Sequence, residues 1–134
     1  MKAPSALVVH PVRPAPWGVS LKQQKKSLFN ALLYRKHPEE YRRRIRSSPP
    51  WDYYATVLSL CLAGSAIVSG DRRILLPSLI SWIVLTGRFC YRRLERASRA
   101  PLHIFEMVVT SALIPPLSVF WRLYGAWKFR VLFF

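Results

Sequence analysis

Acidic residues, cysteines and glycines are scarce in this 134-residue chain, and each scarcity excludes a class of protein. Only six Asp and Glu residues stand against 21 Lys and Arg residues, and no two carboxylates have a standard metal-binding spacing. Two cysteines cannot form a disulfide framework, and no Cys and His residues stand at zinc-ligand spacing. With five glycines and no repeat period, the sequence lacks phosphate-binding glycine loops and collagen-like or propeller arrays.

The chain is instead rich in hydrophobic and basic residues. Hydrophobic residues make up 51% of it, and the formal net charge is +15. Because a chain with high charge and low hydrophobicity is disordered, a chain in which both are high must separate the two kinds of residue in space. They already separate along the sequence. Residues 22–46 hold nine basic and two acidic side chains, and residues 88–99 hold five arginines and one glutamate.

The block 53–70 has the properties of a transmembrane helix. It holds no charged residue, and a helix of this length rises roughly 27 Å, close to the thickness of the hydrocarbon layer. Trp51, Tyr53 and Tyr54 stand where the aromatic belt of a membrane span is expected. The alternative is a buried helix of a soluble protein, but the flanking aromatic residues and arginines favour the membrane.

A second apolar helix is predicted over 74–91, joined to the first by a tight turn that contains Asp71. Its uncharged part, 74–87, is short for a span, but Arg88 extends it by reaching toward the headgroups. Pro77 falls near the expected start of this helix, where a missing N–H costs little. The two segments therefore predict a transmembrane hairpin. Cys61 and Cys90 lie in or beside these apolar blocks and are expected to be small buried hydrophobes.

The segment before the hairpin divides into two parts. Residues 1–20 contain four prolines and are predicted to be extended, with a short strand at 7–9. Residues 21–48 are predicted to form a basic amphipathic interface region. Its helix runs from about residue 21 to 36 with Ser20 as its cap, Pro38 ends or kinks it, and 39–46 is a short basic second segment. The apolar stripe of the helix comprises Leu21, Leu28, Phe29, Leu32 and Leu33. The alternative is a solvated helix packed on a soluble domain.

The membrane region, 49–134, is predicted to end with a third apolar segment over 102–121. Because Lys and Arg accumulate on the cytoplasmic side of spans, the basic blocks predict a multi-pass protein of the cell (inner) membrane with a cytoplasmic N-terminus. Two alternatives stay open for the third segment. A full span would place the last cations outside, whereas a re-entrant or interfacial helix bent at Pro115 and Pro116 would return them to the cytoplasmic face. The charge rule favours the second. The predicted fold class is thus an all-α membrane protein.

Two groups of residues are candidates for chemistry. The first combines cations and amides near a proline-rich turn and a helix start, which suits a diphosphate or sugar hydroxyls, although basic strips also bind headgroups without specificity. Its members are His10, Arg13, Gln23, Gln24, Lys25 and Lys26. The second is His103 with Glu106, whose i, i+3 spacing places both on one helix face. This pair either contacts a lipid-linked substrate at a catalytic mouth or caps the first turn of its helix.

Two long segments resemble a known family. The segment HPVRPAPW, which continues through WGVSLKQQKKSLFNALLYRKHP, resembles the end of the catalytic domain of membrane-associated family 2 glycosyltransferases. The segment PLHIFEMVVTSALIPPLSVFWRLYGAWKFRVLFF resembles the C-terminal tail of a bacterial subgroup of the same enzymes, and together the two cover well over a third of the chain. The resemblance implies sugar transfer from a nucleotide sugar to a cell-envelope glycan or lipid, with a divalent metal on the diphosphate.

The chain departs from that family in two places. At the interface-helix signature Gln-x-x-Arg-Trp, Lys26 replaces the arginine and Ser27 the tryptophan, and lysine is a point charge rather than a bidentate fork. The donor domain with its D-x-D metal site does not occur in the sequence, so no catalytic residue, metal site or cofactor site is assigned. The resemblance therefore predicts the membrane-anchoring, acceptor-side region of such an enzyme, inactive alone, with a separate catalytic domain or subunit as partner.

A second hypothesis rests on the charge pattern alone. It describes a small basic multi-pass membrane protein that binds anionic lipid or a partner protein through its basic blocks. Nucleic-acid binding is not expected. The high isoelectric point is its only support, since the basic residues flank apolar blocks and form no recognised nucleic-acid motif.

Overall fold

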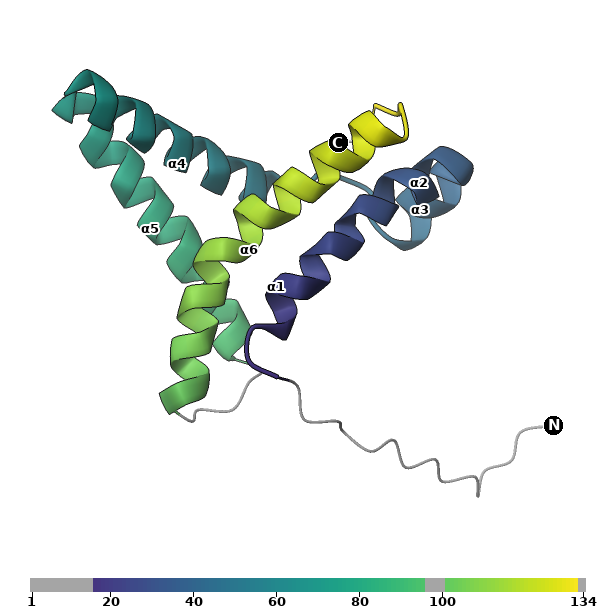
Figure 1. The fold of residues 1–134 in the computed structure, drawn as a ribbon, viewed down its shortest axis with the longest axis horizontal. Coiled ribbons are helices and arrows are strands. Elements are labelled where there is room, and N and C mark those ends of the chain that lie inside the picture. The colour runs from purple at the N-terminus through teal and green to yellow at the C-terminus, as the bar shows by residue number, and fades with distance from the viewer. Residues whose placement is uncertain (1–15, 96–100, 133–134) are drawn as a thin grey trace.

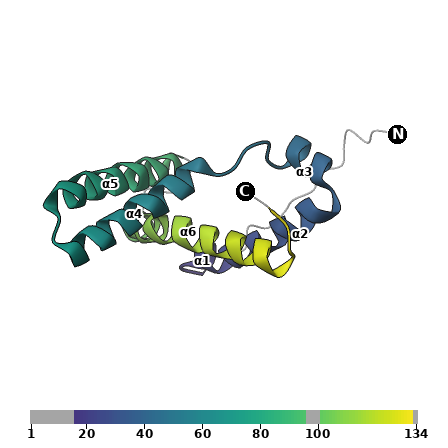
Figure 2. The same cartoon turned by 90° about the horizontal axis from the view of Figure 1, so that it is seen from above.

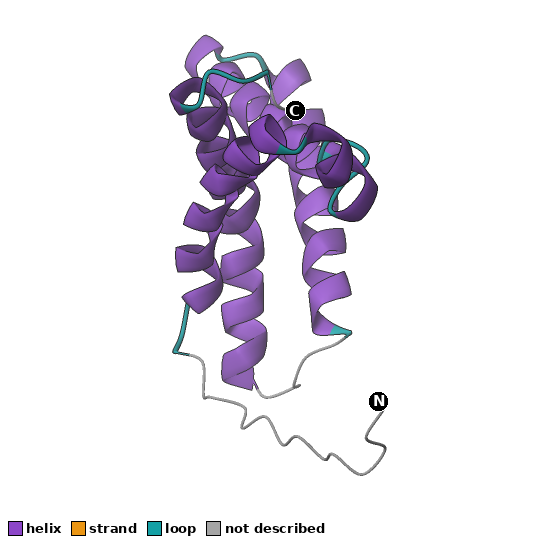
Figure 3. Cartoon of the chain, turned by 90° about the vertical axis from the view of Figure 1, so that its right-hand side faces the viewer, coloured by secondary structure: helices purple, strands orange, loops and turns teal. Residues whose placement is uncertain are grey.

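The computed structural model describes residues 16–95 and 101–132, and within these ranges the chain folds into helices joined by short loops (Figure 3). The expected strand at 7–9 and most of the expected extended segment lie outside the described residues. The described part of the chain contains no strand, and three of its helices are long and apolar enough to cross a membrane. The predicted fold class, an all-α membrane protein, is confirmed.

The basic segment forms four consecutive helical elements, with the expected break at Pro38. These are α1 (Val19–Gln23), the 3₁₀ helix η1 (Gln24–Ser27), α2 (Leu28–Lys36) and α3 (Pro38–Arg44). The chain breaks between α2 and α3 because Pro38 lacks an N–H, which suits it to the first position of a new helix.

The prediction that Ser20 caps the first helix was wrong. The helix begins at Val19, two residues before the expected start at residue 21, and its N-cap is Gly18, which adopts a left-handed conformation with φ of 70°. That conformation costs glycine little, since it has no Cβ. Part of the expected apolar stripe is also turned outward: Leu28 is buried, but Phe29 and Leu33 are exposed.

The predicted hairpin consists of α4 (Trp51–Ser69) and α5 (Arg72–Leu94). Gly70, with φ of 73°, ends α4, and the Asp71 carboxylate accepts a hydrogen bond of 2.9 Å from the backbone N–H of Arg73. Glycine at the C-terminal end of one helix and aspartate at the N-cap of the next are the residues that favour such a turn. Pro77 was misplaced by the sequence argument. It is the sixth residue of α5, beyond the first turn, so it removes one hydrogen bond of the helix.

The third apolar segment is one helix, α6 (Pro101–Lys128), which is longer than the predicted 102–121. It contains Pro115 and Pro116, which can donate no backbone hydrogen bonds, and it changes direction near its middle (Figure 1). Proline inside a helix is a common cause of such a bend because its ring also crowds the preceding turn. The helix therefore has two halves that point in different directions.

Each half of α6 packs against a different part of the chain. The first half contacts the hairpin of α4 and α5, and the second half lies beside η1 and α2 (Figure 1). Seen from above, the hairpin turn lies at the opposite end of the molecule from α2 and α3 (Figure 2). The helical segment α1–α2 runs in the same direction as α6, since Lys25 lies near Trp121 and Arg35 near Phe129.

Small and polar side chains fill the contacts between the long helices, while large apolar side chains point outward. The buried small residues include Thr56, Ser59, Ala63, Ala66, Ser78, Thr110, Ser111 and Ser118. Val68 is 90% exposed, and Cys61, which was expected to be buried, is also exposed. Small residues let helix backbones approach closely, and outward-facing apolar side chains are stable in lipid. This pattern disfavours the alternative of a soluble protein with buried apolar helices.

Candidate functional site

The first predicted constellation is only partly within the described residues. His10 and Arg13 lie outside them. Gln24 lies in η1, where its side-chain amide donates a hydrogen bond of 2.9 Å to the carbonyl oxygen of Ser20 within the same helical segment. Gln23 and Lys26 are exposed, and neither lines any of the pockets described below. The structure therefore does not bring Gln23, Gln24 and Lys26 together into one site, and their role in binding a diphosphate or acceptor stays a prediction.

Lys25, between these residues, belongs to a different feature. Its ammonium group lies 5.8 Å from the centre of the Trp121 ring, and the two residues line a shallow groove of about 330 Å³ with Phe120, Tyr124 and Lys128. A cation over an aromatic face is attracted by the electrons of the ring. The contact holds η1 against the second half of α6.

His103 and Glu106 do come together, with 3.6 Å between His103 Nδ1 and Glu106 Oε2. Glu106 is the sixth residue of α6 and lies beyond its first turn, which disfavours the alternative in which it caps that turn. Its other oxygen, Oε1, accepts a hydrogen bond of 2.8 Å from the backbone N–H of Gly18, the N-cap of α1. A carboxylate at that position also favours the positive end of the α1 dipole. Glu106 therefore fastens the start of α1 to α6.

Arg93 connects α5 to the first half of α6. Its guanidinium donates hydrogen bonds of 2.8 Å to the Thr110 hydroxyl and 2.9 Å to the Ser111 hydroxyl, both of which are buried. It also interacts electrostatically with Glu106. In the sequence, Arg93 is one charge among many in the basic block 88–99. Nothing in the local pattern distinguishes it, because its partners lie 17 and 18 residues further along the chain.

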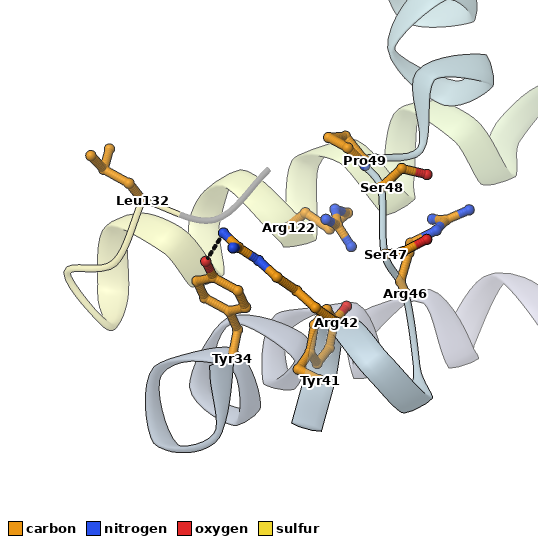
Figure 4. A pocket seen from close by; sticks show the side chains of 9 residues that line it. All are labelled: Tyr34, Tyr41, Arg42, Arg46, Ser47, Ser48, Pro49, Arg122 and Leu132. Carbon is orange, nitrogen blue, oxygen red and sulfur yellow. Dashed lines mark hydrogen bonds between the residues drawn. The ribbon is translucent and has the colours of Figure 1, made fainter. Parts of the chain in front are cut away.

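A pocket of about 310 Å³ lies where α2, α3, the loop before α4 and the end of α6 meet. We call it the arginine pocket, and its lining comprises Tyr34, Tyr41, Arg42, Arg46, Ser47, Ser48, Pro49, Arg122 and Leu132 (Figure 4). The lining residues therefore include three arginines, two tyrosines and two serines. No Asp or Glu side chain is among the lining residues, so the pocket is a candidate for binding an anion.

The basic residues of α3 are divided between two environments. Arg43 and Arg44 both pair with Glu40, at 3.4 Å and 2.6 Å. Arg42 instead turns toward the pocket, where it donates a hydrogen bond to the Tyr34 hydroxyl and lies 5.3 Å from the centre of that ring. The sequence does not separate these arginines from one another, because their allocation depends on which face of a short helix meets α2.

Arg122 is the one pocket arginine from α6, and its side chain extends between α3 and the loop before α4 (Figure 4). It is 3% exposed, whereas Arg42 and Arg46 are exposed. One turn later, Gly125 packs against α2 so closely that an added Cβ would lie 2.6 Å from the Leu28 carbonyl oxygen. Because Gly125 lets α6 approach α2 this closely, Arg122 lies next to α2 and α3.

A second depression of about 440 Å³ shares Arg46, Ser48 and Pro49 with the arginine pocket and continues to Arg92 at the end of α5. Arg92 lies 3.8 Å from Asp52, which is at the start of α4. The basic blocks predicted at 22–46 and 88–99 therefore meet at the beginning of the hairpin.

Within residues 16–95 and 101–132, no three His, Cys, Asp or Glu side chains are grouped so that they could hold a metal ion. No protein-family model, curated protein or solved structure matches the chain. Suggestions about function therefore depend on the geometry and charge of the residues described above, and on the sequence resemblance.

Proposed function

We propose that this chain is an integral membrane protein that binds anionic lipid headgroups through a basic layer formed by α1, η1, α2 and α3. One observation carries the proposal: all nine Lys and Arg side chains of residues 22–46 are exposed. Each cation near an anionic bilayer surface contributes about 1 kcal/mol of attraction. Three apolar helices next to this layer supply the means of holding it at that surface.

The geometry of α6 favours the interfacial alternative for its second half. The part of α6 before Pro115 has 14 residues and is about 21 Å long, less than the roughly 30 Å of hydrocarbon. The part after Pro116 lies beside η1 and α2. If that part crossed the bilayer, it would carry exposed cations of η1 and α2 into the hydrocarbon, at a cost of several kcal/mol each.

We therefore place the basic layer and the end of α6 on one face of the membrane and the α4–α5 turn on the other. By the accumulation of Lys and Arg on the inner side, that face is the cytoplasmic face of the cell (inner) membrane, with the N-terminus cytoplasmic.

Bromine quenching of tryptophan fluorescence tests the headgroup proposal. The protein is reconstituted into bilayers that contain a brominated phosphatidylglycerol or, as the matched control, a brominated phosphatidylcholine. We expect the anionic lipid to quench more strongly at low salt, with the difference shrinking as added salt screens the charges. Equal quenching by the two lipids at low salt would refute the proposal.

A second function, as the acceptor-side membrane region of a family 2 glycosyltransferase, is supported by the resemblance of residues 10–38 and 101–134. The structure offers one feature that suits this role: α1 begins where Glu106 of α6 binds Gly18, so the two resembling segments contact each other. In such an enzyme the nucleotide sugar and divalent metal would bind a separate catalytic domain.

The DNA upstream of the first codon tests this second function. A frame or neighbouring gene that encodes a D-x-D sugar-nucleotide domain, and whose product co-purifies with this chain, is the expected result. Sugar transfer should then require both polypeptides. Transfer by this chain in isolation, or an unrelated neighbourhood with no co-purifying domain, would contradict it.

A further inference from the structure

We propose that the arginine pocket binds a phosphate group, and that this phosphate belongs to a lipid headgroup with two negative charges, as in a phosphomonoester lipid. The inference rests on the proposed headgroup binding and makes it specific: the exposed cations attract anionic lipid in general, and one pocket selects the phosphate.

The donors that line the pocket match a phosphate. Arg42, Arg46 and Arg122 line the pocket, and a guanidinium group carries a planar fork of N–H groups, two of which can bind two phosphate oxygens at once. The hydroxyls of Ser47 and Ser48 add further donors. Three positive charges around one space favour a dianion over a monoanion, because the Coulomb attraction grows with the product of the charges.

The pocket is partly organised before any ligand arrives. Arg122 is 3% exposed, so its side chain has already lost most of its conformational freedom on folding. Arg42 is held over the Tyr34 ring, and Tyr34 in turn packs edge-to-face on the buried Tyr41, with 5.7 Å between ring centres. A preorganised cation loses less entropy on binding than a freely moving surface lysine does.

The size and position of the pocket suit a headgroup. Its volume of about 310 Å³ is at the lower end of the range for small-ligand sites, enough for a phosphate and its immediate substituents but not for an acyl chain. The loop that lines it, through Pro49, leads directly into Trp51 at the start of α4. Since Trp at the end of a membrane helix lies at headgroup depth, the pocket lies at the level of lipid phosphates.

Two double variants distinguish binding in the pocket from binding by general surface charge. In R42Q/R46Q two exposed pocket arginines lose their charge, while in the matched control R43Q/R44Q two exposed arginines of the same segment, outside the pocket, lose theirs. Both variants change the net charge equally. Neither touches the buried Arg122, whose replacement risks unfolding the layer.

The experiment uses the full chain in a phosphate-free maltoside detergent. Three probes are titrated: a short-chain phosphatidic acid, a short-chain phosphatidylglycerol and inorganic pyrophosphate. Binding is followed by the ³¹P resonance of the probe and by tyrosine and tryptophan fluorescence. We expect phosphatidic acid to bind at least about tenfold more tightly than phosphatidylglycerol. R42Q/R46Q should weaken phosphatidic acid binding by about tenfold or more, and R43Q/R44Q by less than about threefold.

The remaining outcomes overturn one part or the other. Equal losses in the two double variants would overturn the pocket and leave the proposed headgroup binding intact. Pyrophosphate that binds as tightly as phosphatidic acid would overturn the lipid assignment in favour of a soluble phosphate. If no probe binds but the anionic lipid still quenches more strongly than the neutral one, the pocket proposal is overturned. If the anionic lipid does not quench more strongly, the headgroup proposal itself is refuted.

Discussion

Replacing Gly125 by alanine tests the close approach of α6 to α2. The added Cβ would lie 2.6 Å from the Leu28 carbonyl oxygen, 3.2 Å from Leu28 Cα and 3.3 Å from Ala31 Cβ. Two of these atoms are backbone, which cannot rotate away as a flexible side chain can, so the helices must separate. Overpacking of this kind costs about 1–3 kcal/mol, while alanine gains up to about 1 kcal/mol over glycine from helix propensity.

Because the closest contact is to backbone, we expect an overpacking cost in the upper part of that range, about 2–3 kcal/mol, so that Gly125→Ala lowers the free energy of unfolding by about 1–2 kcal/mol after the propensity gain. The matched control is Gly87→Ala in α5, where nothing lies within 4 Å of the added Cβ. This substitution should leave stability unchanged or raise it by up to about 1 kcal/mol. Only Gly125→Ala is thus expected to lower the free energy of unfolding.

Thermal unfolding of both variants in the same detergent, followed by circular dichroism at 222 nm, measures the difference. Because Arg122 precedes Gly125 by one turn, the separated helices should also weaken phosphatidic acid binding in Gly125→Ala but not in Gly87→Ala. A Gly125→Ala protein that unfolds at or above the wild-type temperature would refute the claim that glycine is required there.

Three further predictions follow from other contacts. Glu106→Ala removes the acceptor of the Gly18 N–H, so exchange of that amide hydrogen with solvent should accelerate, with a loss of about 1–2 kcal/mol of local stability. Glu106→Gln keeps an acceptor oxygen and should lose less local stability. Arg93→Ala removes two hydrogen bonds between α5 and α6 and should lower the free energy of unfolding by about 1.5–3 kcal/mol. A double-mutant cycle with Ser111→Ala should show coupling between the two residues, and additive effects would contradict a direct contact. A reporter fused after residue 134 should locate to the same face as one fused before residue 1, and opposite faces would show that α6 spans the membrane.

The long helices follow from local properties of the sequence. The uncharged runs, the proline that begins α3 and the Gly70–Asp71 pair each act over a few residues, so α4 and α5 begin and end within three residues of the predicted positions. The errors were also local. Ser20 and Pro77 were assigned roles at helix starts that lie two residues away from the real ones, and these roles depend on the exact position in the first turn.

The site depends on contacts that no local pattern contains. Glu106 meets Gly18 across 88 residues, and Arg35 binds the Phe129 carbonyl across 94. The spacing of His103 and Glu106 accordingly places both on one helix face, but it does not identify Gly18 as the residue whose N–H donates to Glu106. The arginine pocket could not be predicted from the sequence, because Arg122 stands in the sequence only as one of the last cations of the chain.

Composition and charge order alone determine that this protein places apolar helices beside basic segments, because the free energy of moving a residue between water and lipid is a property of that residue. The tertiary structure decides which arginines line the same pocket. The bend in α6 and the glycine contact with α2 set that geometry, and the energy of a helix contact depends on the shapes of both surfaces, which neither segment encodes alone.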